Sequence, residues 1–280
     1  PPALFVISTE ARPSAMRHLI PFLKRKPVVA VIRLAGMIGA GGRAQLSDEI
    51  LAPVIEKAFA RGKPAAVALV INSPGGSPVQ SSLIAARIRR LAEEKKIPVH
   101  AFVEDVAASG GYWLAVAADD IWVDRSSITG SIGVISAGFG AQVFLTRQGI
   151  ERRVYTAGKS KSTLDPFLPE KPEDVTRLKG LLSEIHEAFI DHVKERREGK
   201  LADDPDIFTG EFWLGQRSVE LGLADGIGHI GPKMKEIYGD KVRFAKYGPR
   251  RGILARFGAT LAQDAIGAVE ERASYARFGL

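Results

Sequence analysis

Ser109 lies in a run of small residues, Ala107-Ala108-Ser109-Gly110-Gly111, so its hydroxyl has little bulk on either side. Small neighbours allow a substrate backbone to come close to the serine. The run falls where a predicted strand turns into a helix, and the first turn of a helix offers free N–H groups and positive partial charge. Ser109 is therefore a candidate nucleophile, although the same pattern also fits a serine that only caps a helix.

A serine nucleophile needs a base, and none of the five histidines lies in a glycine-rich run. His186 and His192 fall on a long predicted helix, where we expect them on the polar side. Lys159 and Lys161 are spaced by two and would share one side of an extended segment. A free lysine has a pKa of about 10.4, and burial or a nearby positive charge favours the neutral amine that accepts a proton. The alternative is a pair of solvated surface lysines.

Two other glycine-rich runs, residues 72–76 and 129–133, accompany the run around Ser109. In the first, Gly75 and Gly76 follow a predicted strand. Their backbone N–H groups could bind an oxyanion, or the pair could make a plain turn into the next helix. Neither run is specific by itself, so their meaning depends on where the fold brings them.

The elements that must carry these runs follow from the apolar periodicity. Strands are predicted at 28–32, 65–71, 99–103, 120–123 and 152–156. Helices are predicted at 47–61, 78–95, 112–118, 142–147, 172–197 and 211–221. Strands that alternate with helices indicate a parallel sheet, whose carboxyl strand ends lie along one edge. We therefore expect the three glycine-rich runs to meet at that edge, where open α/β folds bind ligands.

Composition limits the class of protein. The chain has 280 residues, of which 45% are hydrophobic and 25% are charged, as in a globular protein with a sizeable core. The absence of cysteine excludes disulfides, thiolate metal sites and a cysteine nucleophile. No stretch reaches the roughly 18 to 20 apolar residues of a membrane span, and no signal peptide is seen.

The net charge of +7 is concentrated at the two ends. Residues 1–26 hold five basic residues and one acidic residue, and residues 241–280 hold eight and three. We expect a basic N-terminal arm over residues 1–26, a single domain over 27–247, and a basic, partly amphipathic tail over 248–280. The near-neutral body argues against nucleic-acid binding, and the basic ends are compatible with peripheral contact with an anionic membrane.

Five runs together resemble one known family. They are Asn72-Ser73-Pro74-Gly75-Gly76, Ala108-Ser109-Gly110-Gly111-Tyr112, Thr129-Gly130-Ser131-Ile132-Gly133-Val134, Gly158-Lys159-Ser160-Lys161-Ser162 and Gly222-Leu223-Ala224-Asp225. Their order is similar to that in the S49 serine peptidases, the family of signal peptide peptidase A and SohB. Each run is unspecific alone, whereas five in order are specific.

The resemblance implies a ClpP/crotonase-like α/β fold of repeated β-β-α units around a parallel sheet. It also implies a serine endopeptidase that needs no metal or cofactor and forms an acyl-enzyme on apolar peptides such as cleaved signal peptides. The residues carried over are Ser109 as nucleophile, Lys161 as general base with Lys159 as the alternative base, Ser131 as the partner that orients the lysine, and Gly75, Gly76 and Gly110 as oxyanion donors.

The resemblance also implies ring- or dome-shaped assemblies, that is, a homo-oligomer with sites near protomer interfaces. A location at the bacterial inner membrane or in the cytoplasm is implied, with the side of the membrane open because the family's usual N-terminal anchor is not seen. Two other functions fit the same fold. One is a crotonase-type acyl-CoA enzyme with Glu104 or Asp105 as base, and the other is a catalytically silent oligomeric scaffold.

Overall fold

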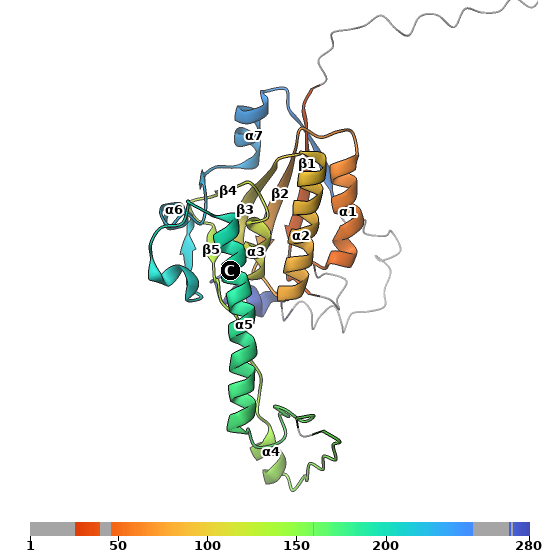
Figure 1. Ribbon diagram of the computed structural model, residues 1–280, viewed down its shortest axis with the longest axis vertical. Helices are drawn as coiled ribbons and strands as arrows, with labels where there is room; N and C mark the ends of the chain where they lie inside the picture. The colour runs from red at the N-terminus through yellow and green to blue at the C-terminus, as the bar shows by residue number, and fades with distance from the viewer. Residues whose placement is uncertain (1–25, 40–45, 159, 249–268, 270) are drawn as a thin grey trace, which may run out of the picture.

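The computed structural model describes residues 26–39, 46–158, 160–248, 269 and 271–280. Most of the predicted N-terminal arm and the first part of the predicted tail lie outside these residues. The described residues form an α/β body from which one long helix extends (Figure 1).

Eight strands of the described chain form a single sheet. They are β1 (Val28–Ala35), β2 (Ala66–Ser73), β3 (Val99–Ala108), β4 (Asp120–Val123), β5 (Ile128–Gly130), β6 (Phe212–Leu214), β7 (Gly226–Ile227) and β8 (Arg243–Tyr247). The strand order is β6-β5-β3-β2-β1-β8, and β4 pairs with β3 and β7. All pairings are parallel except that of β5 with β6. The prediction of an α/β fold with a largely parallel sheet is confirmed.

The first two helices begin where the sequence supplies caps. The hydroxyl of Ser47 accepts a hydrogen bond from an N–H of the first turn of α1 (Asp48–Ala60), and Ser77 does the same for α2 (Pro78–Lys95). The remaining helices are α3 (Gly110–Ala115), α4 (Gln142–Arg147), α5 (Pro172–Arg196), the 3-10 turn η1 (Pro205–Phe208), α6 (Gly215–Glu220) and α7 (Ile230–Tyr238).

Apolar side chains cover both faces of the central strands. Leu69 and Ala101 point to one face, where α1, α2 and α3 complete the main core. Ala68 and Phe102 point to the other face and pack with Met234 of α7. Because the central strands are buried on both faces, their sequences are continuous apolar runs rather than alternating ones.

Two predicted elements are wrong. Residues 152–156 are not a strand, because the segment is mostly exposed and pairs with no other strand of the described chain. The predicted helix at 211–221 starts as β6, which pairs with β5, and becomes helical only at Gly215. In both places a pairing partner, rather than local periodicity, decides the structure.

The long helix α5 joins the body to a projecting part. Near its C-terminal end, Phe189 and Val193 are buried, and Phe189 stacks on Trp113 of α3 with 4.7 Å between ring centroids. The first half of α5 extends away from the sheet towards α4 (Figure 1). We call residues 134–158 and 160–171 the lobe. Within the described ranges no helix is both long and apolar enough to span a membrane.

Candidate active site

Ser109 sits at the point where β3 ends and α3 begins. Its backbone has φ +51° and ψ −123°, a left-handed conformation that is costly for a residue with a side chain. The side chain is half-buried and does not cap α3. Capping therefore does not explain this serine, and the sharp turn resembles the strained strand-to-helix turn that presents a nucleophile in other α/β hydrolases.

Ser131 lies beside Ser109. Strands β3 and β5 pair with Ala108 opposite Gly130, so the two serines follow at the next position of neighbouring parallel strands. The N–H of Ser109 donates to the carbonyl oxygen of Gly130 at 2.9 Å. Ser131 is also left-handed, with φ +52°, and is buried. Neither serine hydroxyl forms a hydrogen bond with another described residue, so both remain able to bind a third group.

The three candidate oxyanion glycines gather around the nucleophile. A Cβ added to Gly75 would lie 2.8 Å from Ser109 Cβ and 2.9 Å from the nitrogen of Gly110. A Cβ added to Gly110 would lie 3.3 Å from the nitrogen of Gly76. These values show that the runs 72–76 and 107–111 touch through their backbones, which glycine alone permits.

The backbone N–H groups of these glycines differ in whether they already donate a hydrogen bond. Gly75 donates its N–H to the hydroxyl of Ser73 at 3.3 Å, and its carbonyl accepts from Ile38. Within the described chain, the N–H groups of Gly76 and Gly110 donate to no partner. Gly110 is the first residue of α3, where the N–H is free by helix geometry. Gly76 and Gly110 therefore offer the pair of donors that an oxyanion hole needs.

Gly75→Ala is expected to destroy serine reactivity. The new methyl group would meet the carbonyl oxygen of Ala108 and Cβ of Ser109, both at 2.8 Å, and Gly75 has φ +105°. We expect a loss of about 2 kcal/mol or more in the free energy of unfolding, together with loss of phosphonate labelling of Ser109. Gly231→Ala, in α7, is the matched control, because its methyl group meets nothing within 4 Å. Normal labelling of Gly75→Ala would contradict this tight geometry.

Lys161, the candidate base, lies on the lobe, and its side chain is exposed. Two residues on, the hydroxyl of Thr163 is 3.5 Å from Asp174 in the first turn of α5. His186, twelve residues further along α5, contacts Ile132 beside Ser131. Twelve helical residues span about 18 Å, which is far beyond the reach of a lysine side chain. Within one copy of the chain, Lys161 and Ser109 are therefore apart; Lys159 lies outside the described residues.

His186 is a site neighbour that sequence reasoning missed. Its Nε2–H donates to the carbonyl oxygen of Ile132 at 2.9 Å, which ties α5 to the loop that follows Ser131. The expectation that His186 and His192 occupy a polar side is wrong, since His192 stacks on Trp113 with 5.1 Å between ring centroids. The signal was present in the spacing: positions 182, 186, 189 and 193 form one helical stripe.

Two of the five runs are joined inside the body. Tyr112, the tyrosine of the Ser-Gly-Gly-Tyr run, is fully buried and donates its hydroxyl to the carbonyl oxygen of Leu223 at 2.8 Å. Burial raises the pKa of this tyrosine, so it stays protonated as a donor. The run 222–225 thus supports the short helix behind Ser109.

Asp225, at the end of that run, holds a buried arginine. It accepts from Arg197 at 2.6 Å and from Lys200 at 2.7 Å. Burial alone would raise the pKa of Asp225, but these hydrogen bonds outweigh it and keep the pKa below its usual value. Arg197 is only 2% exposed, so it depends on this carboxylate for charge compensation.

Asp225→Asn is expected to lower the free energy of unfolding at pH 7 by about 3 kcal/mol or more, because a buried charge loses its partner. Since the folded-state pKa is depressed, the carboxylate stabilises the fold above its ordinary pKa of about 3.9 and loses this effect as pH falls through the folded value. Melting temperatures should thus fall more steeply below about pH 4 in the parent protein than in Asp225→Asn. Asp203→Asn, at an exposed position, is the control. Parallel pH profiles for the parent and Asp225→Asn would contradict the assignment.

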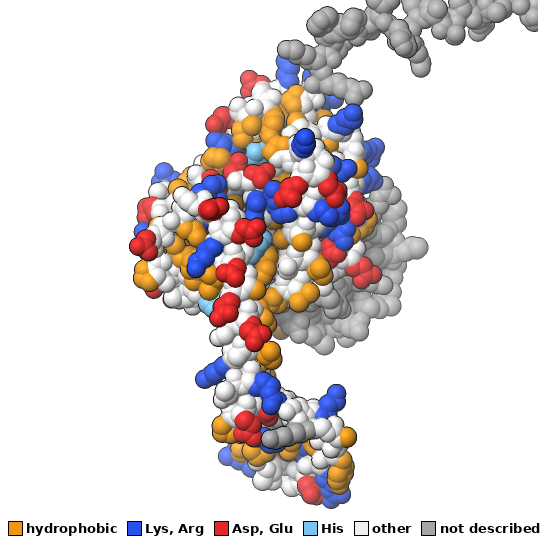
Figure 2. Space-filling view, viewed as in Figure 1, with side chains coloured by type: hydrophobic (Ala, Val, Ile, Leu, Met, Phe, Trp, Pro, Cys, Tyr) orange, Lys and Arg blue, Asp and Glu red, His pale blue; other side chains and the backbone are white. Residues whose placement is uncertain are grey.

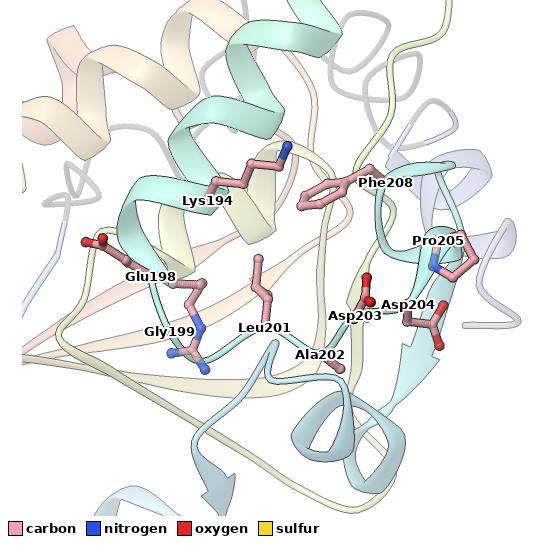
Figure 3. Close-up of a pocket in the computed structure, with 10 residues that line it drawn as sticks. Lys194, Glu198, Gly199, Leu201, Ala202, Asp203, Asp204, Pro205 and Phe208 are labelled. Atoms are coloured by element: carbon pink, nitrogen blue, oxygen red, sulfur yellow. The ribbon is translucent and has the colours of Figure 1, made fainter.

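A hollow of about 530 Å³ lies between the end of α5 and the turn η1 (Figure 3). Its lining includes Lys194, Asp203 and Phe208, and Lys194 Nζ lies 5.3 Å from the Phe208 ring centroid. It contains none of the candidate site residues. The carboxylates of the acyl-CoA alternative are engaged elsewhere: Glu104 pairs with Arg33, and Asp105 accepts from Asn72.

Comparison with known proteins shows the family of the chain. The model of peptidase family S49 matches residues 91–237, more than half of the chain. A protease named SohB from Haemophilus influenzae is 31% identical over 247 residues, which cover 87% of this chain and 67% of that protein. The chain belongs to peptidase family S49.

Two further comparisons are with a longer relative and with a solved structure. A relative from Brucella abortus named Na(+)/H(+) antiporter NhaA is 50% identical over 291 positions, 96% of this chain. The chain spans only 40% of that relative, whose name refers to the longer protein. A solved structure of the 1510-N membrane-bound stomatin-specific protease covers 80% of this chain and 99% of its own, with a TM-score of 0.50. Its 16% identity shows the shared fold alone.

Proposed function

We propose that this chain is a serine endopeptidase in which Ser109 is the nucleophile and Lys161 is the general base. The observation that carries the proposal is the close packing of the left-handed turn at Ser109 and Gly110 against Gly75 and Gly76, which brings the free N–H groups of Gly76 and Gly110 near each other. A reactive hydroxyl next to two uncommitted donors is the arrangement that acyl transfer requires. Membership of a peptidase family supports the same reaction class.

The proposed reaction proceeds through an acyl-enzyme. The neutral lysine amine takes the proton of the Ser109 hydroxyl while the oxygen attacks the peptide carbonyl carbon. The oxyanion of the tetrahedral intermediate accepts hydrogen bonds from Gly76 and Gly110. As the C–N bond breaks, the lysine gives its proton to the leaving amine. Water, activated by the same lysine, then releases the carboxylate product and restores Ser109.

We propose further that the lysine comes from a second copy of the chain. The separation of Lys161 from Ser109 within one copy, derived from the length of α5, supports this. The hydroxyl of Ser131 is free to orient an incoming amine. A lysine that enters a neighbouring site leaves water, and desolvation favours the neutral form that acts as a base.

The surface of the lobe supports assembly. Seven large apolar side chains are exposed there: Ile135, Phe139, Val143, Phe144, Ile150, Tyr155 and Phe167. Apolar patches on the lobe are visible among basic side chains in Figure 2. Leu181 and Ile185 continue the exposed apolar surface along α5 towards the body. Surfaces of this kind mark protein contacts, and a second copy that covers the lobe would bring its own lobe to the first copy.

Serine labelling tests the proposed chemistry. A fluorophosphonate probe is expected to attach covalently to Ser109, because the probe mimics the tetrahedral intermediate and uses the same nucleophile. Mass spectrometry of the digested protein locates the label, and hydrolysis of an extended apolar peptide is measured in parallel. A label on another serine, or none, argues against the proposal. Saturable binding of CoA without labelling would favour the acyl-CoA alternative.

A further inference from the structure

The last ten residues, 271–280, return to the edge of the sheet that carries the candidate site. We call them the C-terminal segment. They are the dark-blue end of the chain, helical over residues 271–276, and lie at the lower end of the sheet (Figure 1). Phe278 is 9% exposed and packs with Val106, Ala108 and Ile128 in a cluster separate from the main cores. One of these neighbours directly precedes Ser109.

Phe278 shares a buried apolar cluster with residues of both strands that end in a candidate site serine. Ala108 leads into Ser109, and Ile128 belongs to β5, which leads into Ser131. The ring of Phe278 also meets Phe212 edge to face, with 5.1 Å between centroids. Phe212 pairs with Gly130 across the antiparallel β5–β6 contact. Phe278 therefore joins the packing of the strands that lead into both turns.

The C-terminal segment reaches the glycine run as well. The hydroxyl of Tyr275 donates to the carbonyl oxygen of Asn72 at 2.7 Å, at the start of the run 72–76. Ser274 donates to the sulfur of Met37 at 3.4 Å, next to Ile38, whose backbone pairs with Gly76. Each loop of the candidate site therefore has a contact with this segment close to its base.

These contacts lie next to two turns whose backbone conformation is strained. Ser109 and Ser131 are two of the five non-glycine residues of the described chain that have positive φ. Left-handed conformations of such residues persist only when the surroundings enforce them. The residue before each turn must therefore be held in place, and Phe278 belongs to the buried cluster that contains Ala108.

We propose that the C-terminal segment is a positioning element of the active site, acting through Phe278 and Tyr275 on the turns of Ser109, Ser131 and Gly76. The inference rests on the proposed peptidase function. The segment touches the strand ends rather than the hydroxyls, so its effect is on the rate of acylation. Substrate binding is affected less, because the contacts of Tyr275 and Phe278 lie at Asn72 and at the strand ends.

Phe278→Ala tests the inference in the chain of residues 1–280. We expect phosphonate labelling of Ser109 and kcat to fall by about 10- to 100-fold, as for small displacements of catalytic groups, with little change in KM. Phe278→Leu should recover most of the rate, and Arg272→Ala, at an exposed position, is the control. Thermal melting shows whether each variant is folded.

The outcomes separate the two proposals. If the parent protein is not labelled at Ser109, the peptidase proposal fails. If the parent is labelled and folded Phe278→Ala is labelled at the same rate, only the positioning role fails. A faster rate also overturns it, because the segment would then obstruct the site. If Phe278→Ala does not fold, Tyr275→Phe decides, since it removes only the hydroxyl and its hydrogen bonds to the backbone, among them the bond to Asn72: a reduced rate supports the role and an unchanged rate overturns it.

Discussion

Ser109→Ala is expected to abolish peptide hydrolysis while the protein stays folded. The variant removes one oxygen that forms no hydrogen bond with another described residue, so stability should change little. Hydrolysis should fall by at least about 1,000-fold, because the remaining binding and oxyanion groups cannot form the acyl-enzyme. The measurement is the initial rate on an extended apolar peptide, with the melting temperature recorded for the same sample.

Two controls accompany this variant. Ser183→Ala removes an exposed hydroxyl on α5 and should retain full activity. Ser131→Ala should reduce activity less than Ser109→Ala, because an orienting hydroxyl assists the base without forming a covalent bond. Full hydrolysis by Ser109→Ala would reject Ser109 as the nucleophile, and the scaffold alternative would gain support if no other serine were labelled.

Lys161→Ala is expected to be as inactive as Ser109→Ala, yet a mixture of the two inactive proteins should regain activity. Because α5 separates Lys161 from Ser109 in one copy, the proposed site takes its serine and its lysine from different copies. In a random equal mixture about a quarter of sites then combine an intact serine with an intact lysine, for any closed symmetric assembly. Recovery of about that fraction of parental activity is the expected result.

The mixing experiment has a matched control. Ser109→Ala mixed with the double variant Ser109→Ala/Lys161→Ala contains no intact serine and should stay inactive. Exchange of subunits is verified by native mass spectrometry. Exchange without recovered activity would show that the two residues do not act across copies. Lys159→Ala should lose activity less completely than Lys161→Ala, and the reverse order would exchange the two lysines in the proposal.

Local sequence patterns predicted most of the elements of the described chain. The bounds of α2 and α4 agree with the predictions from apolar spacing, and Ser47 and Ser77 cap the first two helices. The alternation of strands and helices predicted parallel pairing, and with it the meeting of the glycine-rich runs at one edge. The contact between Gly75 and Ser109 bears out that expectation. These features depend on neighbours within a few residues or on a topological rule, so one chain is enough to predict them.

Other features depend on partners distant in sequence. The strand β6 forms because β5 lies beside it, and residues 152–156 lack such a partner. His186 faces Ile132 because α5 crosses the end of β5, and Phe278 packs on Ala108, 170 positions earlier in the chain. Periodicity within one segment contains no information about these contacts between distant segments.

The sequence alone determined the order of the five runs, the parallel α/β architecture and the chemical types of the candidate residues, since these follow from local spacing and composition. Tertiary structure decided which of them meet. It brought Ser109, Ser131, Gly76 and Gly110 together, left Lys161 at the far end of α5, and returned the C-terminal segment to the base of the site. Such long-range contacts arise from packing of whole elements, which no single stretch of residues specifies.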